Sequence, residues 1–267
     1  MISSEHILFV FEGERTEKDF TRKFIKYYFS EPQGKVVTTA FCGEIYQLLE
    51  KMTDDFGLGS IDLFPLLQEI PQNKFLQNFK RDQFSQIYLF FDYDPHASTA
   101  NDDKLREMLA FFDQETGNGK LFVSYPMVEA TRCLHEDCSY DCFANLAVPL
   151  QYGQAFKGFS SDYASHTFRR VVSWSRQYWD EIIIRHCEKA NFISTGQTGL
   201  PEKPIASQSI FEGQLRHIGG SGHIYVLSSF PVMFADYFGM AYIRGFARGI
   251  VIGNNCPHRT LLDSLAS

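Results

Sequence analysis

The chain has 267 residues, of which 44% are hydrophobic, so it is long and apolar enough to bury a substantial core. No apolar run approaches the roughly 20 residues of a membrane span, and the first residues lack the basic start of a signal peptide. Without a secretion signal, the six cysteines are expected to be reduced thiols of a cytoplasmic protein.

The net charge of −7 argues against a surface devoted mainly to nucleic-acid binding, but the charge is unevenly distributed. Residues 1–150 contain 14 Lys and Arg against 24 Asp and Glu, a net charge of −10, whereas residues 151–267 carry +3. An acidic first part suits a carboxylate metal site, and a mildly basic second part suits contact with phosphates. Ordinary surface variation explains the same asymmetry equally well.

Predicted strands and helices alternate in the first half of the chain, which favours a parallel sheet with right-handed crossovers. In order, we expect a strand over residues 7–11, a helix over 16–29, a strand over 35–42, helices over 44–55 and 61–80, a strand over 86–91, a helix capped by Asn101 or Thr99, a turn at 117–119, a strand over 121–123 and a helix beginning near Pro126.

Strand alternation is weak from residue 139 onward. We therefore expect two domains, a sheet domain over 1–138 and a mostly helical addition over 139–267 that packs on it. The expected elements of the addition are helices over 163–190, 207–218 and 230–238 and a late strand over 223–227. The polar side of the helix over 163–190 carries Arg169, Arg170, Arg176 and Arg185. This side is either a contact for nucleic acid or simply a solvated face.

Two of the apolar strands end abruptly at carboxylates. Glu12 follows the strand over 7–11, and Asp92 and Asp94 follow the strand over 86–91. Ligands of open parallel sheets collect at the carboxyl ends of strands. Carboxylates held close together repel unless a cation lies among them. We therefore expect Glu12, Asp92 and Asp94 to form an acidic pocket for a hard cation such as Mg²⁺ or Mn²⁺.

These strand-end motifs resemble those of the Toprim catalytic domain, in particular the RloB-like and OLD-type Toprim proteins of bacterial defence systems. The resemblance covers residues 5–135, and its order and placement at strand ends make it more specific than any single motif. It rests on three segments, Glu12-Gly13-Glu14-Arg15-Thr16-Glu17, Asp92-Tyr93-Asp94-Pro95-His96 and Ser124-Tyr125-Pro126-Met127-Val128-Glu129.

The resemblance implies a Mg²⁺- or Mn²⁺-dependent nuclease that cleaves DNA or RNA as an effector of anti-phage defence, with one or two ions bound. It assigns catalysis to Glu12, Asp92 and Asp94, and it adds Glu17 and Glu129 to these three as metal ligands. Two cations about 4 Å apart can activate the attacking water and neutralise the leaving oxygen. The candidates for contact with the substrate are Ser124, His96, Arg169, Arg170 and Arg176.

The same resemblance implies an ABC- or AAA-type ATPase as partner. The chain itself contains no Gly-x-x-x-x-Gly-Lys-Ser/Thr loop, so control by ATP would have to come from another subunit. A homodimer is compatible with this plan, and no membrane partner is expected.

Each candidate also has a purely structural interpretation. Glu12 can cap the following helix, and Glu17 can interact with the positive end of that helix. Asp92 and Asp94 can be turn residues. No motif places a His–Asp pair beside Ser124, so hydrogen bonding is favoured over nucleophilic attack for its hydroxyl.

Cys133, His135, Cys138 and Cys142 fall within ten residues and are four side chains of the types that bind zinc. Their spacing does not contain a paired Cys-x-x-Cys knuckle. Buried free cysteine is common, so a zinc site is disfavoured here.

Two other functions remain open. Asp92-Tyr93-Asp94 also resembles the nucleophile motif of haloacid dehalogenase-type phosphatases, although that motif normally lies near the start of its fold and leaves Glu12 unexplained. The other alternative is a non-catalytic Toprim-like module that binds a partner. Neither DNA nor RNA is favoured as the substrate.

Overall fold

The computed structural model describes residues 6–13, 16–30, 35–43, 45–54, 57–58, 62–93, 101–135 and 140–247. The chain divides into two compact units, Met1–Val123 and Ser124–Ser267. It is an α/β protein with a mostly parallel five-stranded sheet flanked by helices, followed by a helical C-terminal part. The expected fold class is confirmed at this level.

The first unit holds the sheet and the helices that cross over it. Its strands are β1 (His6–Phe11), β2 (Val36–Phe41), β3 (Thr53–Asp54), β4 (Gly57–Leu58), β5 (Gln86–Asp92), β6 (Asp113–Gln114) and β7, which runs over Gly119–Ser124. Its helices are α1 (Thr16–Ile25), α2 (Ile45–Met52), α3 (Leu63–Glu69) and α4 (Asp102–Phe111), with a π-helix at Lys26–Ser30 and 3₁₀ segments at Pro71–Asn78 and Arg81–Gln83.

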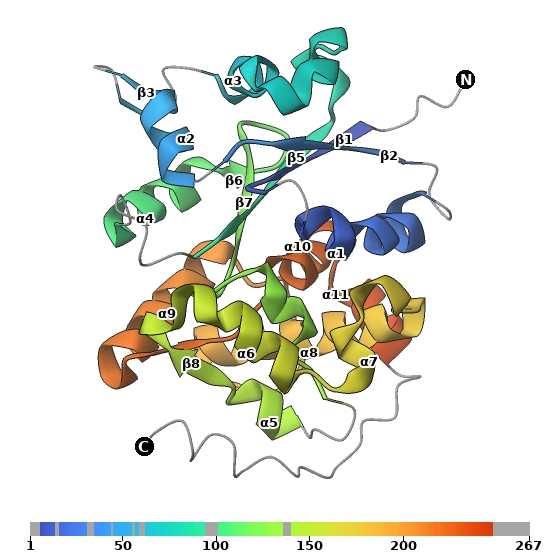
Figure 1. Cartoon of the computed structure of the whole chain (residues 1–267), viewed down its shortest axis with the longest axis vertical. Helices are drawn as coiled ribbons and strands as arrows, with labels where there is room; N and C mark the ends of the chain where they lie inside the picture. Colours follow the sequence, from blue (N-terminus) through green and yellow to red (C-terminus); the bar gives the residue numbers. More distant parts are fainter. Residues whose placement is uncertain are drawn as a thin grey trace. The chain divides into compact units, whose positions relative to one another are not determined.

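The sheet has the order β2-β1-β5-β7-β6, and β1 runs parallel to both of its neighbours. After β1, the chain forms β2 on one side of β1, and it then crosses back to form β5 on the other side of β1. Accordingly, α1 lies on one face of the sheet and α2 and α3 lie on the opposite face (Figure 1), as right-handed crossovers require. The strand order therefore reverses between β1 and β5, and open α/β sheets bind ligands at such a switch point.

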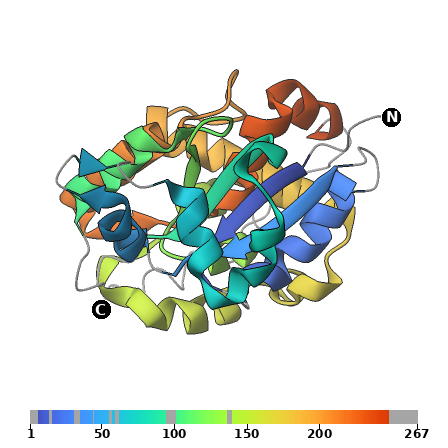
Figure 2. The ribbon, with the colours of Figure 1, turned by 90° about the horizontal axis from the view of Figure 1, so that it is seen from above.

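Strands β1 and β5 are apolar because they are covered on both faces. β1 and β2 run side by side in register (Figure 2), and every residue of β1 from Ile7 onward is buried. Phe9 lies at the middle of an aromatic cluster. The centroid of its ring is 5.2 Å from the ring centroid of Phe90 and 5.4 Å from that of Phe29. This packing gives the carboxyl ends of β1 and β5 a rigid base.

The second unit is mostly helical, and α8 packs against α5, α9, α10 and α11. Its helices are α5 (Tyr140–Ala144), α6 (Phe156–Tyr163), α7 (His166–Arg169), α8 (Arg176–Thr195), α9 (Ser207–Ser221), α10 (Ser229–Phe238) and α11 (Met240–Ala247). The antiparallel strands β8 (Ala147–Pro149) and β9 (His223–Tyr225) and 3₁₀ segments at Val128–Arg132, Leu150–Ala155 and Val171–Ser173 complete it.

Most expected elements are present, with shifted ends. Asn101 is the N-cap of α4, and its side-chain oxygen accepts hydrogen bonds from the backbone of Asp103 and Lys104. The segment expected to be helical over 61–80 contains α3 and then a 3₁₀ segment that begins at Pro71. The helix expected to begin near Pro126 is a short 3₁₀ segment over Val128–Arg132.

The continuous helix expected over 163–190 is wrong. The chain breaks after α7, and α8 begins only at Arg176, where Ser175 is the N-cap and accepts a hydrogen bond from the backbone of Tyr178. Val172, an apolar residue inside the expected helix, is 68% exposed. A serine cap thus overrides a run of side chains that has helical spacing.

Arg185 is also placed wrongly by the sequence pattern. It is only 4% exposed, so it does not share a solvated face with the other three arginines. Within the described part of the chain, no helix is long and apolar enough to cross a membrane.

Candidate functional site

Glu12 lies directly beyond the last residue of β1, and its backbone continues the sheet. Its N–H donates to the carbonyl of Phe90 at 3.3 Å, and its own carbonyl accepts from the N–H of Gly43 at 3.2 Å. Gly43 has φ +75°, which a glycine adopts without strain. The half-buried Glu12 is therefore fixed from both sides, between the ends of β5 and β2, at the switch point of the sheet.

Asp92 is the last residue of β5 and is half-buried. Its backbone N–H donates to Oε2 of Glu12 at 3.1 Å, a hydrogen bond between residues 80 apart in sequence. The structure thus brings together Glu12 and Asp92, two of the three residues that the sequence assigned to an acidic pocket, through the backbone N–H of Asp92. The third, Asp94, lies outside the described residues, as does His96.

The donor set at this point suits a hard divalent cation. Mg²⁺ in enzymes is commonly held by one or two carboxylates, with waters and substrate phosphates completing its shell. Glu12 and Asp92 supply two such groups, and the hydrogen bond from Asp92 uses one oxygen of Glu12 without neutralising its charge. Among the residues that the structure describes, no set of three or more His, Cys, Asp or Glu side chains is arranged to hold a metal ion.

Tyr93 anchors the chain next to this pair, and sequence reasoning missed it. It is buried, and its hydroxyl donates to Oδ1 of Asp102 in the first turn of α4 at 3.0 Å. Burial and the nearby Asp102 carboxylate raise the pKa of the Tyr93 phenol well above its ordinary value, so it stays a donor. The signal in the sequence is an aromatic residue between two aspartates at a strand end, where alternate side chains face opposite ways.

Glu17 and Glu129, the proposed further ligands, lie in different units. Glu17 belongs to α1, and its side chain is outside the described part of the structure. Glu129 is only 4% exposed, and its Oε1 lies 3.8 Å from Nζ of Lys157. Its Oε2 is buried and accepts no hydrogen bond within the described residues. A buried carboxylate with one uncommitted oxygen is compatible with a ligand role.

Ser124 is fully buried and its hydroxyl is engaged. Its Oγ lies 2.8 Å from Oγ of Ser229 and accepts from the backbone N–H of the same residue at 3.2 Å. Beside it, Oγ1 of Thr131 and Oγ of Ser228 are 2.6 Å apart. These hydroxyls connect the chain around Pro126 to the start of α10, and they give Ser124 a structural task besides the contact with substrate predicted for it.

Arg169, Arg170 and Arg176 are exposed, as contact with nucleic acid requires. Arg169 ends α7 and Arg170 follows it, whereas Arg176 opens α8 and donates from Nη2 to the hydroxyl of Tyr242 at 3.1 Å. All three belong to the second unit.

The residues considered for zinc differ in burial and in bonding. Cys133 is fully buried, which raises the pKa of its thiol to about 12, and its Sγ lies 3.7 Å from the carbonyl oxygen of Glu129. His135 is half-buried, and Cys138 lies outside the described residues. Cys142 is disulfide-bonded, so the expectation of six reduced thiols is wrong for this residue.

Comparisons of the chain with protein-family models, curated proteins and solved structures found no match. The fold and the site define an α/β protein in which Glu12 and Asp92 are joined by a hydrogen bond at the switch point of its sheet. The resemblance to Toprim nucleases stays a prediction that rests on the sequence motifs.

Proposed function

We propose that this protein is a divalent-metal-dependent nuclease of the Toprim type, which hydrolyses phosphodiester bonds of DNA or RNA. The observation that carries the proposal is the pairing of Glu12 and Asp92 at the ends of two neighbouring buried strands, at the switch point of the sheet. Two carboxylates on rigid strands suit a site for Mg²⁺ or Mn²⁺, and the order of the three sequence motifs supports the same assignment.

In this proposal, Glu12 and Asp92 hold the cation, and Asp94, Glu17 and Glu129 complete the site. A bound Mg²⁺ would supply Lewis-acid stabilisation of the phosphoryl oxygens and lower the pKa of an attacking water. The hydrogen bond from the backbone of Asp92 keeps the carboxylate of Glu12 in place before substrate binds. Tyr93, the residue after β5, is held against α4 by its hydrogen bond to Asp102.

The exposed arginines of the second unit, Arg169, Arg170 and Arg176, are proposed to contact substrate phosphates. The resemblance also supports a role in anti-phage defence together with an ATPase subunit. No observation favours the phosphatase alternative, because Asp92 ends β5 rather than the first strand.

The first test is cleavage of plasmid DNA, single-stranded DNA and tRNA by purified protein with Mg²⁺ or Mn²⁺. The variants Glu12→Gln and Asp92→Asn are expected to lose at least about 100-fold in rate, since even changes around the direct ligands of a metal site cost about 10- to 100-fold. Glutamine keeps an oxygen that can accept the hydrogen bond from residue 92, so the fold is expected to survive.

The matched controls are Glu107→Gln and Asp82→Asn, which neutralise exposed carboxylates of the first unit outside the site. They are expected to cleave like the unmodified protein. If a missing partner keeps the protein inactive, calorimetric titration with Mn²⁺ replaces cleavage. Loss of Mn²⁺ binding in Glu12→Gln but not in Glu107→Gln supports the site. Failure of the unmodified protein to bind either ion refutes the proposal.

A further inference from the structure

A cavity of about 420 Å³ lies in the first unit at the opposite end of the sheet from Glu12 and Asp92. Ile87, the second residue of β5, lines the cavity, and Asp92 ends the same strand five residues later. That separation is about 17 Å along an extended strand, so the cavity is distinct from the carboxylate pair. Its volume falls within the range of about 300–1,000 Å³ that is typical of small-molecule sites.

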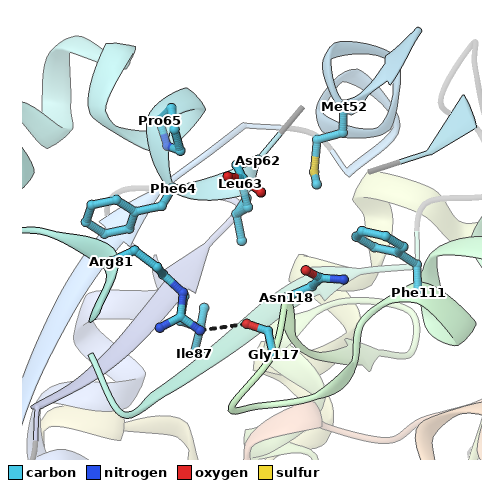
Figure 3. Close-up of a pocket in the computed structure, with 10 residues that line it drawn as sticks. All are labelled: Met52, Asp62, Leu63, Phe64, Pro65, Arg81, Ile87, Phe111, Gly117 and Asn118. Atoms are coloured by element: carbon cyan, nitrogen blue, oxygen red, sulfur yellow. Dashed lines mark hydrogen bonds between the residues drawn. The ribbon is translucent and has the colours of Figure 1, made fainter. Parts of the chain in front are cut away.

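The apolar walls of the cavity come from three helices (Figure 3). Met52 of α2 and Phe111 of α4 lie on one side, and Phe64 of α3 lies on the other. The ring of Phe64 points away from the other two side chains and is buried beside Phe84, so the thioether of Met52 and the ring of Phe111 form the wall on which a flat aromatic ligand can pack.

Two polar side chains face the same space, Asp62 just before α3 and Asn118 in the turn before β7. Neither side chain forms a hydrogen bond within the described residues. A carboxylate only accepts hydrogen bonds, whereas an amide both donates and accepts. A ligand between them must therefore offer N–H donors to Asp62, and an acceptor, alone or together with a donor, to Asn118. Asp62 also disfavours any ligand that would place an anionic group against it.

The frame around these groups is fixed by hydrogen bonds. Arg81 donates to the carbonyls of Phe84 at 2.7 Å and Gly117 at 2.6 Å, and it thereby joins the chain before β5 to the turn that carries Asn118. The next residue, Gly119, has φ +118°, and a side chain there would collide with a leucine of β5. The polar edge of the cavity is thus in place without a ligand, which lowers the cost of binding one.

We propose that this cavity binds a purine nucleoside through a base that carries an exocyclic amine. The base would pack against Met52 and Phe111, with its edge paired to Asp62 and Asn118. Asparagine pairs with the amino and N7 groups of adenine, and aspartate accepts hydrogen bonds from amino groups of bases. Guanine offers two neighbouring N–H groups to a carboxylate and two acceptors to an amide, so the two aminopurines share the required chemistry.

The proposal is tested by calorimetric titration of the purified full chain with guanosine, adenosine, purine riboside and uridine. EDTA in the buffer removes cations from the carboxylate pair. We expect at least one of the two aminopurine nucleosides to bind, and purine riboside and uridine to bind at least about tenfold more weakly, because a hydrogen bond to a charged group is lost. Whether guanosine or adenosine binds more tightly identifies the base.

The variants Asp62→Asn and Asn118→Ala are each expected to weaken binding of that nucleoside about tenfold or more. Both residues are exposed, so their replacement is expected to leave the melting temperature unchanged. Asp82→Asn, an exposed carboxylate outside the cavity, and Glu12→Gln are expected to bind as the unmodified protein does.

The proposal is overturned if neither aminopurine nucleoside binds at millimolar concentration, or if purine riboside binds as tightly as they do. It is also overturned if the Asp62 and Asn118 variants keep full affinity, or if Glu12→Gln abolishes binding. None of these results depends on cleavage of nucleic acid, so failure here leaves the proposed nuclease activity to be judged on its own test.

Discussion

At the scale of single residues, His186 of α8 is a buried base held in its neutral form. Its Nδ1 accepts a hydrogen bond from the backbone N–H of Ser228 at 3.0 Å, so the proton of the neutral ring is on Nε2. Burial, reinforced by the positive charge of Lys189, lowers the pKa of His186 well below its ordinary value. Lys189 in turn donates to the carbonyls of Phe143 and Leu146, both at 2.6 Å.

This arrangement predicts a loss of stability in acid. Below about pH 6.5 the unfolded chain protonates His186 while the folded chain does not, so the contribution of this residue is present above that pH and is lost as pH falls. Glu188 acts in the opposite sense, because burial raises the pKa of its carboxyl to about 7 and protonation then favours the folded state between pH 7 and 4.5.

The two effects are separated by comparing variants in chemical denaturation at pH 7.5 and 5.5. His186→Asn keeps an acceptor near Ser228 but does not titrate. The unmodified protein is expected to lose about 1 kcal/mol more than this variant between the two pH values. His166→Asn, an exposed histidine on α7, serves as the control and is expected to behave like the unmodified protein. Equal losses in the unmodified protein and His186→Asn would contradict the assignment.

The sequence placed Glu12 and Asp92 because an abrupt change from apolar to acidic residues is a local signal at a strand end. The sequence did not predict the hydrogen bond between them, because its donor is a backbone N–H, which no pattern of side chains indicates. Arg185 was misplaced for a related reason. Helical spacing says which residues share a face, but it does not say whether another helix covers that face.

At the scale of elements, Asn73 holds the edge strand β2 against the 3₁₀ segment that follows α3. Its side chain is completely buried and accepts from the N–H of Phe41 at 2.9 Å. It also donates to the carbonyls of Phe41 at 2.6 Å and Leu67 at 3.0 Å. One amide thus satisfies the outward-facing backbone groups of a strand that would otherwise be left unpaired at the edge of the sheet.

Asn73→Ala is therefore expected to lower the free energy of unfolding by about 3 kcal/mol, because three hydrogen bonds are lost and buried backbone groups stay unpaired. Urea denaturation measures this value. The control is Asn78→Ala at the exposed end of the same 3₁₀ segment, for which a change within about 0.5 kcal/mol is expected. Equal stability of the two variants would show that the bonds of Asn73 contribute little.

Helices and strands with strong local signals were predicted well, whereas their boundaries and their breaks were not. The cap of α4 is readable because Asn101 is followed by a clear helical stripe. The break between α7 and α8 was missed because Val171 and Val172 continue the helical spacing, although Val172 faces solvent. At Gly213 of α9 a side chain would collide with the carbonyl of Ile193 on α8, a close approach that only the packed helices reveal.

At the scale of the whole molecule, charge is the property that the sequence reports most directly. The sequence does not report the order of the strands directly. Strands β1 and β5 pair although they are remote in sequence, and their pairing depends on the packing of the helices between them. The α/β class followed from alternation alone, but the reversal of strand order that marks the site needed the structure.

The charge asymmetry predicts that nucleic-acid binding, if the proposed function is right, is salt-dependent and requires the second unit. Removing two exposed cations in Arg169→Ala/Arg170→Ala is expected to lower the slope of log affinity against log salt concentration by about 2. The control, Lys51→Ala/Lys74→Ala, removes the same charge from exposed positions of the first unit. Fluorescence anisotropy with labelled oligonucleotides measures both, and an unchanged slope in the arginine variant contradicts the assigned contact.

The hydrogen bond that positions Glu12 has a consequence for how the site can be dissected. Its donor is the backbone of residue 92, so every amino acid except proline at that position supplies the same N–H. A substitution of Asp92 thus removes a charge without releasing its neighbour. Here the contribution of one carboxylate can be measured while the geometry of the other stays constant.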